Sequence, residues 1–236
     1  MFYQSRTKQL ASLLGLVFVT ALALVPQFSN AATIQYDFDH EFSSGTPPSG
    51  PAPWLRAVFS DVAPGTVQLT LSTVNLTGSE FVSGWYFNLN PLFSTADLAI
   101  SSTGSAGAFD APTVYRGTDA FKADGDGKYD LLFSFATGGD DSQRFTSGDS
   151  LTLTFSGIVG LTADDFNFMS APAGGHGPYV AAAHVQSIAS GYSGWVDPST
   201  TIPGGDVQVP DNSSTLLLLG LGFIAFATFH RRLQPS

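Results

Sequence analysis

The sequence predicts an all-β protein whose central part is an antiparallel β-sandwich of the jelly-roll kind. Three observations predict it: apolar residues alternate with polar ones in several short segments, glycine, proline and aspartate separate these segments, and no stretch keeps a helical apolar period of 3.6 residues. No alternation of strands and helices is visible, which argues against a Rossmann or barrel-type enzyme fold. The segment 32–190 is long enough for one sizeable core.

The first expected strands lie in the N-terminal half of this segment. Two runs begin near Thr33 and Trp54, and a third alternates from Val67 to Leu71. The apolar parity changes after Thr73, which predicts a bulge or a strand end there. The following expected strands each place their apolar residues on one face: Phe81, Trp85, Phe87 and Leu89, then Tyr129, Leu131, Phe133 and Phe135, then Leu151, Leu153 and Phe155.

Two more strands and two irregular segments complete the expected order. The strands lie at Phe166 to Phe168 and at Val180 to Ile188. The Ser/Gly/Ala-rich piece from Ser101 to Ala108 predicts a long loop. Residues 191–208, rich in Gly, Ser and Pro, predict a linker between the sandwich and the C-terminal segment.

Residues 1–31 have the pattern of a secretory signal peptide. A basic stretch around Arg6 precedes an uncharged apolar run from Leu10 to Val25, which predicts a signal helix. Ser29 and Ala31 supply small residues at the two positions that a signal peptidase reads, so we expect cleavage after Ala31. The alternative is an anchor helix that is retained.

Residues 209–236 form a second terminal segment with a different pattern. Its uncharged apolar run from Thr215 to Phe229 would span about 22 Å as a helix, against roughly 30 Å of bilayer hydrocarbon. The polar spacer before the run and snorkelling arginines after it would extend this length. Because the run is apolar on every face, a transmembrane helix is favoured over a buried core helix. Arg231 and Arg232 would keep its far end in the cytoplasm.

The same residues resemble a PEP-CTERM sorting signal of the Val-Pro-Asp type. The resemblance implies recognition by an exosortase, a membrane-embedded cysteine protease or transpeptidase, in a Gram-negative bacterium that makes extracellular polysaccharide. Val209, Pro210 and Asp211 would be the recognition motif, and Arg231 and Arg232 would be the cytoplasmic stop. The sequence departs from the usual Pro-Glu-Pro form at Asp211. The implied course is export, a transient tether in the inner membrane, and release to the cell surface or extracellular matrix.

Residues 53–190 also resemble a recurring ectodomain found ahead of such tails. The landmarks are the segments from Phe81 to Leu89, from Tyr129 to Phe135 and from Ala181 to Gln186. This resemblance implies an architecture and no reaction.

Composition excludes several classes of function. The chain has no cysteine, so it has no disulfide framework, thiolate zinc site or cysteine nucleophile. Asp and Glu number 19 against 9 Lys and Arg, for a formal net charge of −10, and all but one of the acidic residues lie within 32–210. Such a surface repels nucleic acid and anionic headgroups, so we expect no nucleic-acid partner. It suits a soluble secreted protein or one that binds cations.

One acidic segment is a candidate calcium site. Asp124, Asp126 and Asp130 lie close together among glycines, and calcium takes about six to eight oxygen ligands. The segment is not an EF-hand loop, because the twelfth position would fall on Phe135. The alternative is a Gly-rich hairpin whose aspartates favour the turn. No other cofactor is predicted.

Aromatic residues suggest a further candidate site. Trp54, Trp85, Trp195 and Tyr86 could form a platform on which a sugar ring stacks, or they could all be packing residues. Trp195 lies in the predicted linker and is the best candidate for an exposed ring. His184, which shares a strand face with Gln186, is expected to be a hydrogen-bonded packing residue. No Gly-x-Ser-x-Gly motif occurs, so no serine nucleophile is nominated.

The sequence therefore predicts an exported protein that is processed by signal peptidase and an exosortase. We expect a non-catalytic structural or binding component linked to extracellular polysaccharide or biofilm. One alternative is a polysaccharide-active enzyme whose carboxylate pair only the fold brings together. Another is a calcium-dependent carbohydrate-binding adhesin.

Overall fold

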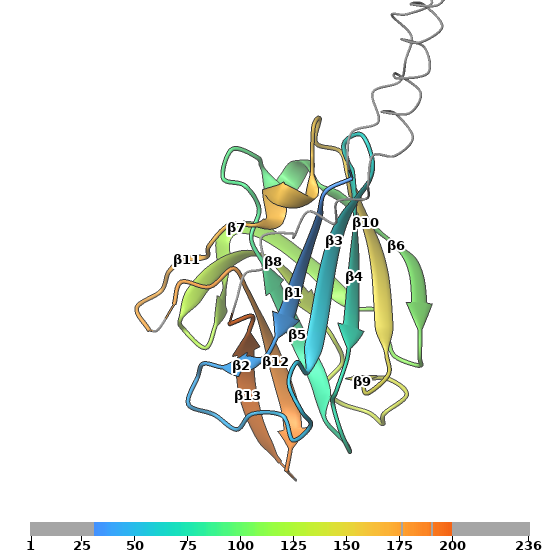
Figure 1. The fold of residues 1–236 in the computed structure, drawn as a ribbon, viewed down its shortest axis with the longest axis vertical. Helices are drawn as coiled ribbons and strands as arrows, with labels where there is room; N and C mark the ends of the chain where they lie inside the picture. The colour runs from blue at the N-terminus through green and yellow to red at the C-terminus, as the bar shows by residue number, and fades with distance from the viewer. Residues whose placement is uncertain (1–30, 176, 190, 200–236) are drawn as a thin grey trace, which may run out of the picture. The chain divides into compact units, whose positions relative to one another are not determined.

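A computed structural model describes residues 31–175, 177–189 and 191–199, and within them almost all regular structure is antiparallel β-sheet. This confirms the predicted all-β class. One sheet has five strands in the order β1-β3-β4-β10-β6 (Figure 1). These strands are β1 (Thr33–Phe38), β3 (Leu55–Ala63), β4 (Thr66–Thr73), β10 (Ser150–Ser156) and β6 (Ala99–Ala106).

The other sheet has eight strands. Its main order is β11-β8-β5-β12-β13-β2, while β7 pairs with β8 and β9 pairs with β5. The strands are β2 (His40–Glu41), β5 (Phe81–Phe87), β7 (Thr113–Ala123), β8 (Gly127–Ser134), β9 (Phe145–Thr146), β11 (Ala171–Pro172), β12 (Ala181–Ile188) and β13 (Tyr192–Asp197). Two short 3-10 helices, η2 (Thr95–Asp97) and η3 (Ala163–Phe166), lie in the connections.

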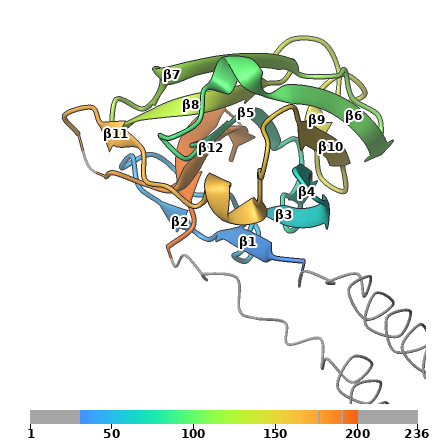
Figure 2. The ribbon, with the colours of Figure 1, turned by 90° about the horizontal axis from the view of Figure 1, so that it is seen from above.

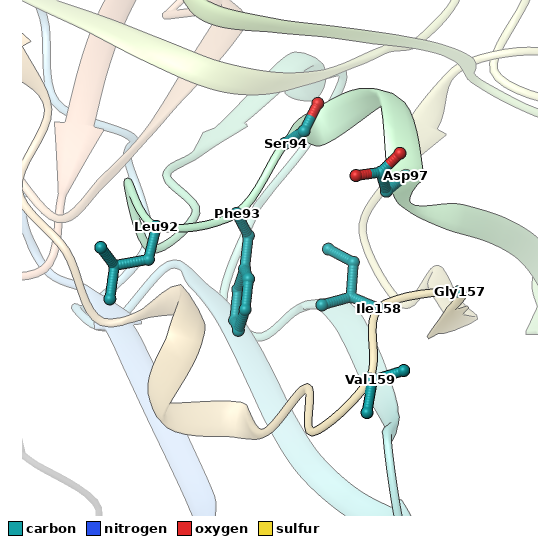
Figure 3. A pocket seen from close by; sticks show the side chains of 7 residues that line it. All are labelled: Leu92, Phe93, Ser94, Asp97, Gly157, Ile158 and Val159. Carbon is teal, nitrogen blue, oxygen red and sulfur yellow. The ribbon is translucent and has the colours of Figure 1, made fainter.

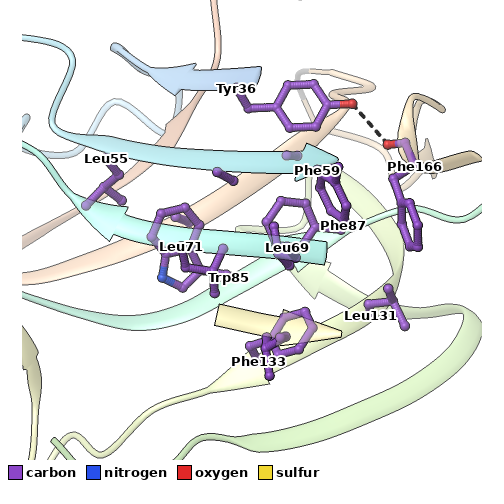
Figure 4. Close-up of a cluster of buried hydrophobic side chains, with 14 of the residues drawn as sticks. Tyr36, Leu55, Phe59, Leu69, Leu71, Trp85, Phe87, Leu131, Phe133 and Phe166 are labelled. Atoms are coloured by element: carbon purple, nitrogen blue, oxygen red, sulfur yellow. Dashed lines mark hydrogen bonds between the residues drawn. The ribbon is translucent and has the colours of Figure 1, made fainter. Parts of the chain in front are cut away.

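The two sheets face each other over one apolar core, as a sandwich does (Figure 2). Phe59 of the five-stranded sheet meets Phe87 of the eight-stranded sheet edge to face at 5.2 Å, and it stacks on Phe166 at 4.5 Å. The Tyr36 hydroxyl donates a hydrogen bond to the Phe166 carbonyl oxygen at 3.0 Å, so the ring's polar tip is satisfied inside the core (Figure 4). Aromatic side chains therefore join the layers.

Strict alternation holds in strands β1, β4 and β10 of the five-stranded sheet. In β4 and β10 every second residue is buried, and these residues include the predicted Val67, Leu69 and Leu71. β4 ends at Thr73, where the sequence predicted a bulge or a strand end. The prediction succeeds here because a pleated strand with one wet face shows its pattern directly in the sequence.

The eight-stranded sheet departs from the predicted faces at two places. The pairing of β5 with β12 shifts register at Ser83, so Val82 joins Trp85 in the core. Phe81, predicted on that face, lies instead under the Arg144 guanidinium, 4.8 Å from its ring centre. Tyr129 also leaves the face predicted for it and packs on the other side of the sheet. In β5 the extra residue Ser83 reverses the side chains beyond it, which a period-two pattern does not reveal. Beside Tyr129 the register shift lies in the partner strand β7, between Arg116 and Phe121.

The predicted loop at 101–108 and the predicted linker at 191–208 are both wrong in part. Residues 99–106 form the edge strand β6 on β10, although most of its residues are exposed. Strand β13 pairs with β12 on one side and with β2 on the other, so the sandwich extends to Asp197. Gly194 fits there because an added Cβ would lie 2.3 Å from the Thr46 carbonyl oxygen. The small residues of this segment suggested a linker. Gly194 is small because the segment at Thr46 lies close to β13.

The predicted strand at Phe166 to Phe168 is replaced by η3 and an extended stretch. Thr162 begins η3 with a capping box, because the Asp165 carboxylate accepts from the Thr162 backbone N–H and hydroxyl, each at 2.9 Å. This Thr-x-x-Asp pattern was the sequence signal for a helical turn.

The signal helix in residues 1–31, the transmembrane helix at 215–229 and the rest of the linker lie outside the described residues, apart from Ala31. In the part of the chain that is described, no helix has the length and apolar character needed to cross a membrane.

Candidate functional site

The structure does not assemble the predicted calcium ligands. Among the described residues, no group of three or more His, Cys, Asp or Glu side chains could hold a metal ion. The two oxygens of Asp130 accept hydrogen bonds from the backbone N–H groups of Leu89 and Asp119, at 2.9 and 2.8 Å. Burial raises the pKa of Asp130, and these two hydrogen bonds oppose the rise. Asp130 therefore joins β8 to the segments that carry Leu89 and Asp119.

Asp124 and Asp126 belong to the tight turn between β7 and β8. Asp124 adopts a positive φ of 48°, a conformation that aspartate tolerates in turns. Asp126 is buried against the loop that carries Gly175, where an added Cβ would lie 1.4 Å from its Oδ1 atom. The hairpin alternative fits these positions, and calcium binding by Asp124, Asp126 and Asp130 stays a prediction.

The outer side of the eight-stranded sheet carries a second aromatic cluster, which we call the aromatic face. Its buried residues are Phe42, Ala123, Tyr129 and Ala182. Three partly buried rings pack against them: Tyr86, Tyr179 and Trp195. Burial raises the pKa of both Tyr129 and Tyr86, as desolvation disfavours a phenolate. Of the four residues proposed as a sugar platform, Trp54 and Trp85 are buried in the main core. Tyr86 and Trp195 are brought together on the aromatic face.

Small residues on two strands let these rings meet. Tyr86 pairs with Ala182 and Trp195 pairs with His184 across adjacent strands, and the two ring centres are 5.4 Å apart. At Gly84 an added Cβ would lie 3.0 Å from the Tyr86 ring, so a larger residue would displace it. The alanine-rich sequence of β12 and Gly84 of β5 therefore leave space for the aromatic rings.

His184 stacks on Trp195 and is held by its neighbours. The two ring centres are 4.3 Å apart with an interplanar angle of 15°. Nδ1 of His184 lies 2.9 Å from the Ser83 hydroxyl oxygen, and the Gln186 amide nitrogen donates to that oxygen at 3.1 Å. Burial lowers the pKa of His184, which favours the neutral ring. His184 is hydrogen-bonded as predicted, but it stands beside Trp195, which the sequence pattern had placed in a linker.

A hollow of about 450 Å³ lies near one margin of this sheet. Its lining includes His40, Tyr179 and Asp197. Nδ1 of His40 is 2.8 Å from Oδ1 of Asp197, which is buried although His40 is exposed. Burial raises the pKa of Asp197 and the His40 imidazole lowers it, with burial dominant. This contact joins β2 to β13.

A second hollow, of about 360 Å³, lies between two connections at one end of the sandwich (Figure 3). Phe93 and Ile158 contribute apolar side chains to it, and Leu92 and Val159 are 87 and 96% exposed. Asp97 is the one titratable residue of its lining. No acid-base pair lines this hollow, so it offers no catalytic arrangement.

Sequence reasoning missed Ser83, Phe42, Tyr129 and Tyr179 as parts of one surface. Ser83 reaches His184 because the bulge in β5 redirects its side chain, and only the paired strands reveal the bulge. The Ala-Ala-Ala-His segment of β12 was the one usable signal, since three small residues in a strand leave space above the sheet.

A family model matches the end of the chain. The VPDSG-CTERM motif matches residues 208–233. This segment is a PEP-CTERM-like sorting signal. The chain has the Val209-Pro210-Asp211 part of the motif, followed by Asn212 and Ser213. No curated protein and no solved structure matches the chain. The match therefore concerns the tail, and it indicates an exported protein of the PEP-CTERM type.

Proposed function

We propose that this chain is a non-catalytic component of the cell surface or extracellular matrix, released from an inner-membrane tether by an exosortase. The observation that carries the proposal is the sorting-signal match at 208–233. Its support is the N-terminal pattern of a signal peptide, with small residues at Ser29 and Ala31 for signal peptidase. The acidic, cysteine-free sandwich between these segments suits a protein that works outside the cell.

The role of the sandwich is to bind or organise extracellular polysaccharide. The aromatic face supports this proposal, because half-buried Tyr and Trp rings with polar tips are suited to packing on sugars. The core between the sheets is filled mainly by Phe and Leu side chains. Most glycoside hydrolases need instead a pair of carboxylates that flank the bound sugar.

The test of sorting is the intact mass of the protein from its native host, with and without the exosortase. We expect truncation near Pro210 only when the exosortase is present, and an N-terminus at Ala32 in both strains. An uncut tail in both strains would show that the apolar run is an anchor and would overturn the sorting proposal.

A separate assay tests the absence of catalysis. The purified chain is incubated with the host's extracellular polysaccharide, and new reducing ends are measured. We expect none above the polysaccharide alone. Release of reducing ends that depends on protein concentration would favour the polysaccharide-active enzyme.

A further inference from the structure

Three ring atoms on the aromatic face have no hydrogen-bond partner among the described residues. They are the Tyr86 hydroxyl, Nε1 of Trp195 and Nε2 of His184, since the hydrogen bonds of these residues involve other atoms. None of the three belongs to the buried polar atoms that lack a partner, so solvent reaches each of them. The ring centres of His184 and Tyr86 lie 4.3 and 5.4 Å from that of Trp195, so the three rings form one group.

The hydrogen bonds beneath His184 decide which of its nitrogens carries the proton. The Gln186 amide N–H donates to the Ser83 oxygen at 3.1 Å and lies 3.3 Å from Nδ1 of His184. The Ser83 hydroxyl lies 2.9 Å from Nδ1 and 3.4 Å from the His184 carbonyl oxygen, and the shorter contact favours donation of its one proton to Nδ1. The Gln186 amide nitrogen can only donate, so its contact with Nδ1 also requires Nδ1 to accept. Because Nδ1 accepts, the neutral ring carries its proton on Nε2 and presents a fixed donor to solvent.

The ligand must suit both the rings and the donors. The rings offer apolar surface, and the tips offer N–H and O–H groups directed at acceptors, a combination that matches a polyol with an apolar C–H face. The Glu41 carboxylate borders the site, because its Oε1 accepts a hydrogen bond from the Trp195 backbone N–H at 3.3 Å. The chain's net charge of −10 disfavours an anionic ligand.

We propose that Tyr86, His184 and Trp195 form a binding site for an uncharged saccharide, whose C–H face packs on the Tyr86 and Trp195 rings. Its hydroxyl oxygens accept hydrogen bonds from Nε2 of His184 and Nε1 of Trp195. Ser83 and Gln186 are positioning residues that keep Nε2 protonated. This assignment rests on the proposed function, because only an exported protein would meet extracellular saccharide. The binding test does not involve the tail.

The binding test is calorimetry of the full chain with uncharged hexasaccharides of glucose, galactose, mannose and N-acetylglucosamine. We expect at least one to bind, Trp195→Ala to abolish its binding, and His184→Gln to weaken it about five- to tenfold. Thr70→Ala, on the outer side of the five-stranded sheet, is the matched control and leaves binding unchanged. Binding of none of the four sugars, or equal binding by Trp195→Ala, would overturn the site.

The tautomer is tested without ligand, by nitrogen-15 NMR of the imidazole. We expect the Nε2-protonated neutral form of His184 in the wild type, and a mixture of both neutral forms in Ser83→Ala. A ring protonated on Nδ1 would overturn the assignment of the donor. Failure here with normal truncation near Pro210 refutes this site alone, whereas an uncut tail with intact saccharide binding refutes the sorting proposal alone.

Discussion

The outer faces of the two sheets differ although both face solvent. The outer side of the five-stranded sheet carries hydroxyl and amide side chains from all five strands, and Arg56 with Asp37 makes an ion pair at 2.6 Å there. One complete row is Thr33, Ser60, Gln68, Thr154 and Ser101. We call this the hydroxyl face. On the eight-stranded sheet, the aromatic face buries rings against each other outside the main core.

The difference follows from how regular the strands are. Register shifts in the five-stranded sheet are confined to the end of β3 and to the edge strand β6. In the eight-stranded sheet they interrupt β5, β7 and β12 near the aromatic face. Bulges redirect individual side chains and so allow a composite surface, whereas unbroken alternation gives a uniform one. The irregular face is accordingly the candidate site.

The largest expected loss of stability tests whether both sheets pack on one shared core. We expect Phe59→Ala to lower the free energy of unfolding by about 3–5 kcal/mol, because its ring touches aromatic rings from both sheets and from η3. Urea unfolding of the full chain measures the loss. Phe59→Leu, which keeps most of the volume, should cost clearly less. A loss below about 1 kcal/mol for Phe59→Ala would show that the sheets are not joined at this ring.

The next effect asks whether the aromatic face is a core in its own right. Tyr129→Ala should cost roughly 2–4 kcal/mol, since the ring is fully buried 5.7 Å from the Tyr86 ring. Tyr129→Phe keeps the ring and is the matched control, expected within about 1 kcal/mol of wild type. If Tyr129→Ala costs no more than a hydroxyl-face substitution, the two faces are energetically alike.

A third prediction concerns the carboxylate beside the aromatic face. Asp130→Ala should cost about 1–3 kcal/mol because it leaves the amides of Leu89 and Asp119 without an acceptor. Asp141→Ala, whose carboxylate is exposed, should stay within about 0.5 kcal/mol. Melting curves with and without millimolar calcium complete the test, and a higher wild-type midpoint with calcium would restore the metal-site alternative.

The stability of the eight-stranded sheet should depend on pH through Asp197. Its pKa in the folded protein is raised above the ordinary value of 3.8, so the folded state binds this proton more tightly than the unfolded state. The resulting stability is complete below 3.8 and is lost as pH rises through the raised value. Relative to Asp197→Asn, the wild type should therefore gain stability as pH falls through that window. A difference that stays flat, or has the opposite sign, would contradict the burial of this carboxyl group.

The smallest expected effect lies on the hydroxyl face. Thr70→Ala should change the free energy of unfolding by no more than about 0.5 kcal/mol, because no described hydrogen bond uses the Thr70 hydroxyl and its side chain is partly exposed. Urea unfolding under the same conditions measures it. A loss near that of Tyr129→Ala would mean that the hydroxyl face is also packed against something.

The sequence could predict the regular half of this molecule. Val67, Leu69 and Leu71 alternate without interruption, so their burial follows from the pattern. The aromatic face could not be predicted in the same way. Its rings come from strands distant in the chain, Ser83 is directed by a bulge, and Trp195 lies among small residues that suggest a linker. Pairing between distant strands decides these positions, and one sequence carries no direct record of it.

The strand that the sequence did not reveal has a mechanical consequence. Strand β13 is the last strand of the described chain. It pairs with β12 on one side and with β2 on the other, where His40 lies opposite Asp197. The Ser199 backbone N–H also donates to Asp39 at 2.9 Å. A pull on the C-terminal end, directed along the strand, would load the hydrogen bonds on both sides together and not one after another. Tension applied through the tail would thus meet shear resistance at β13 before it reached the rest of the sandwich.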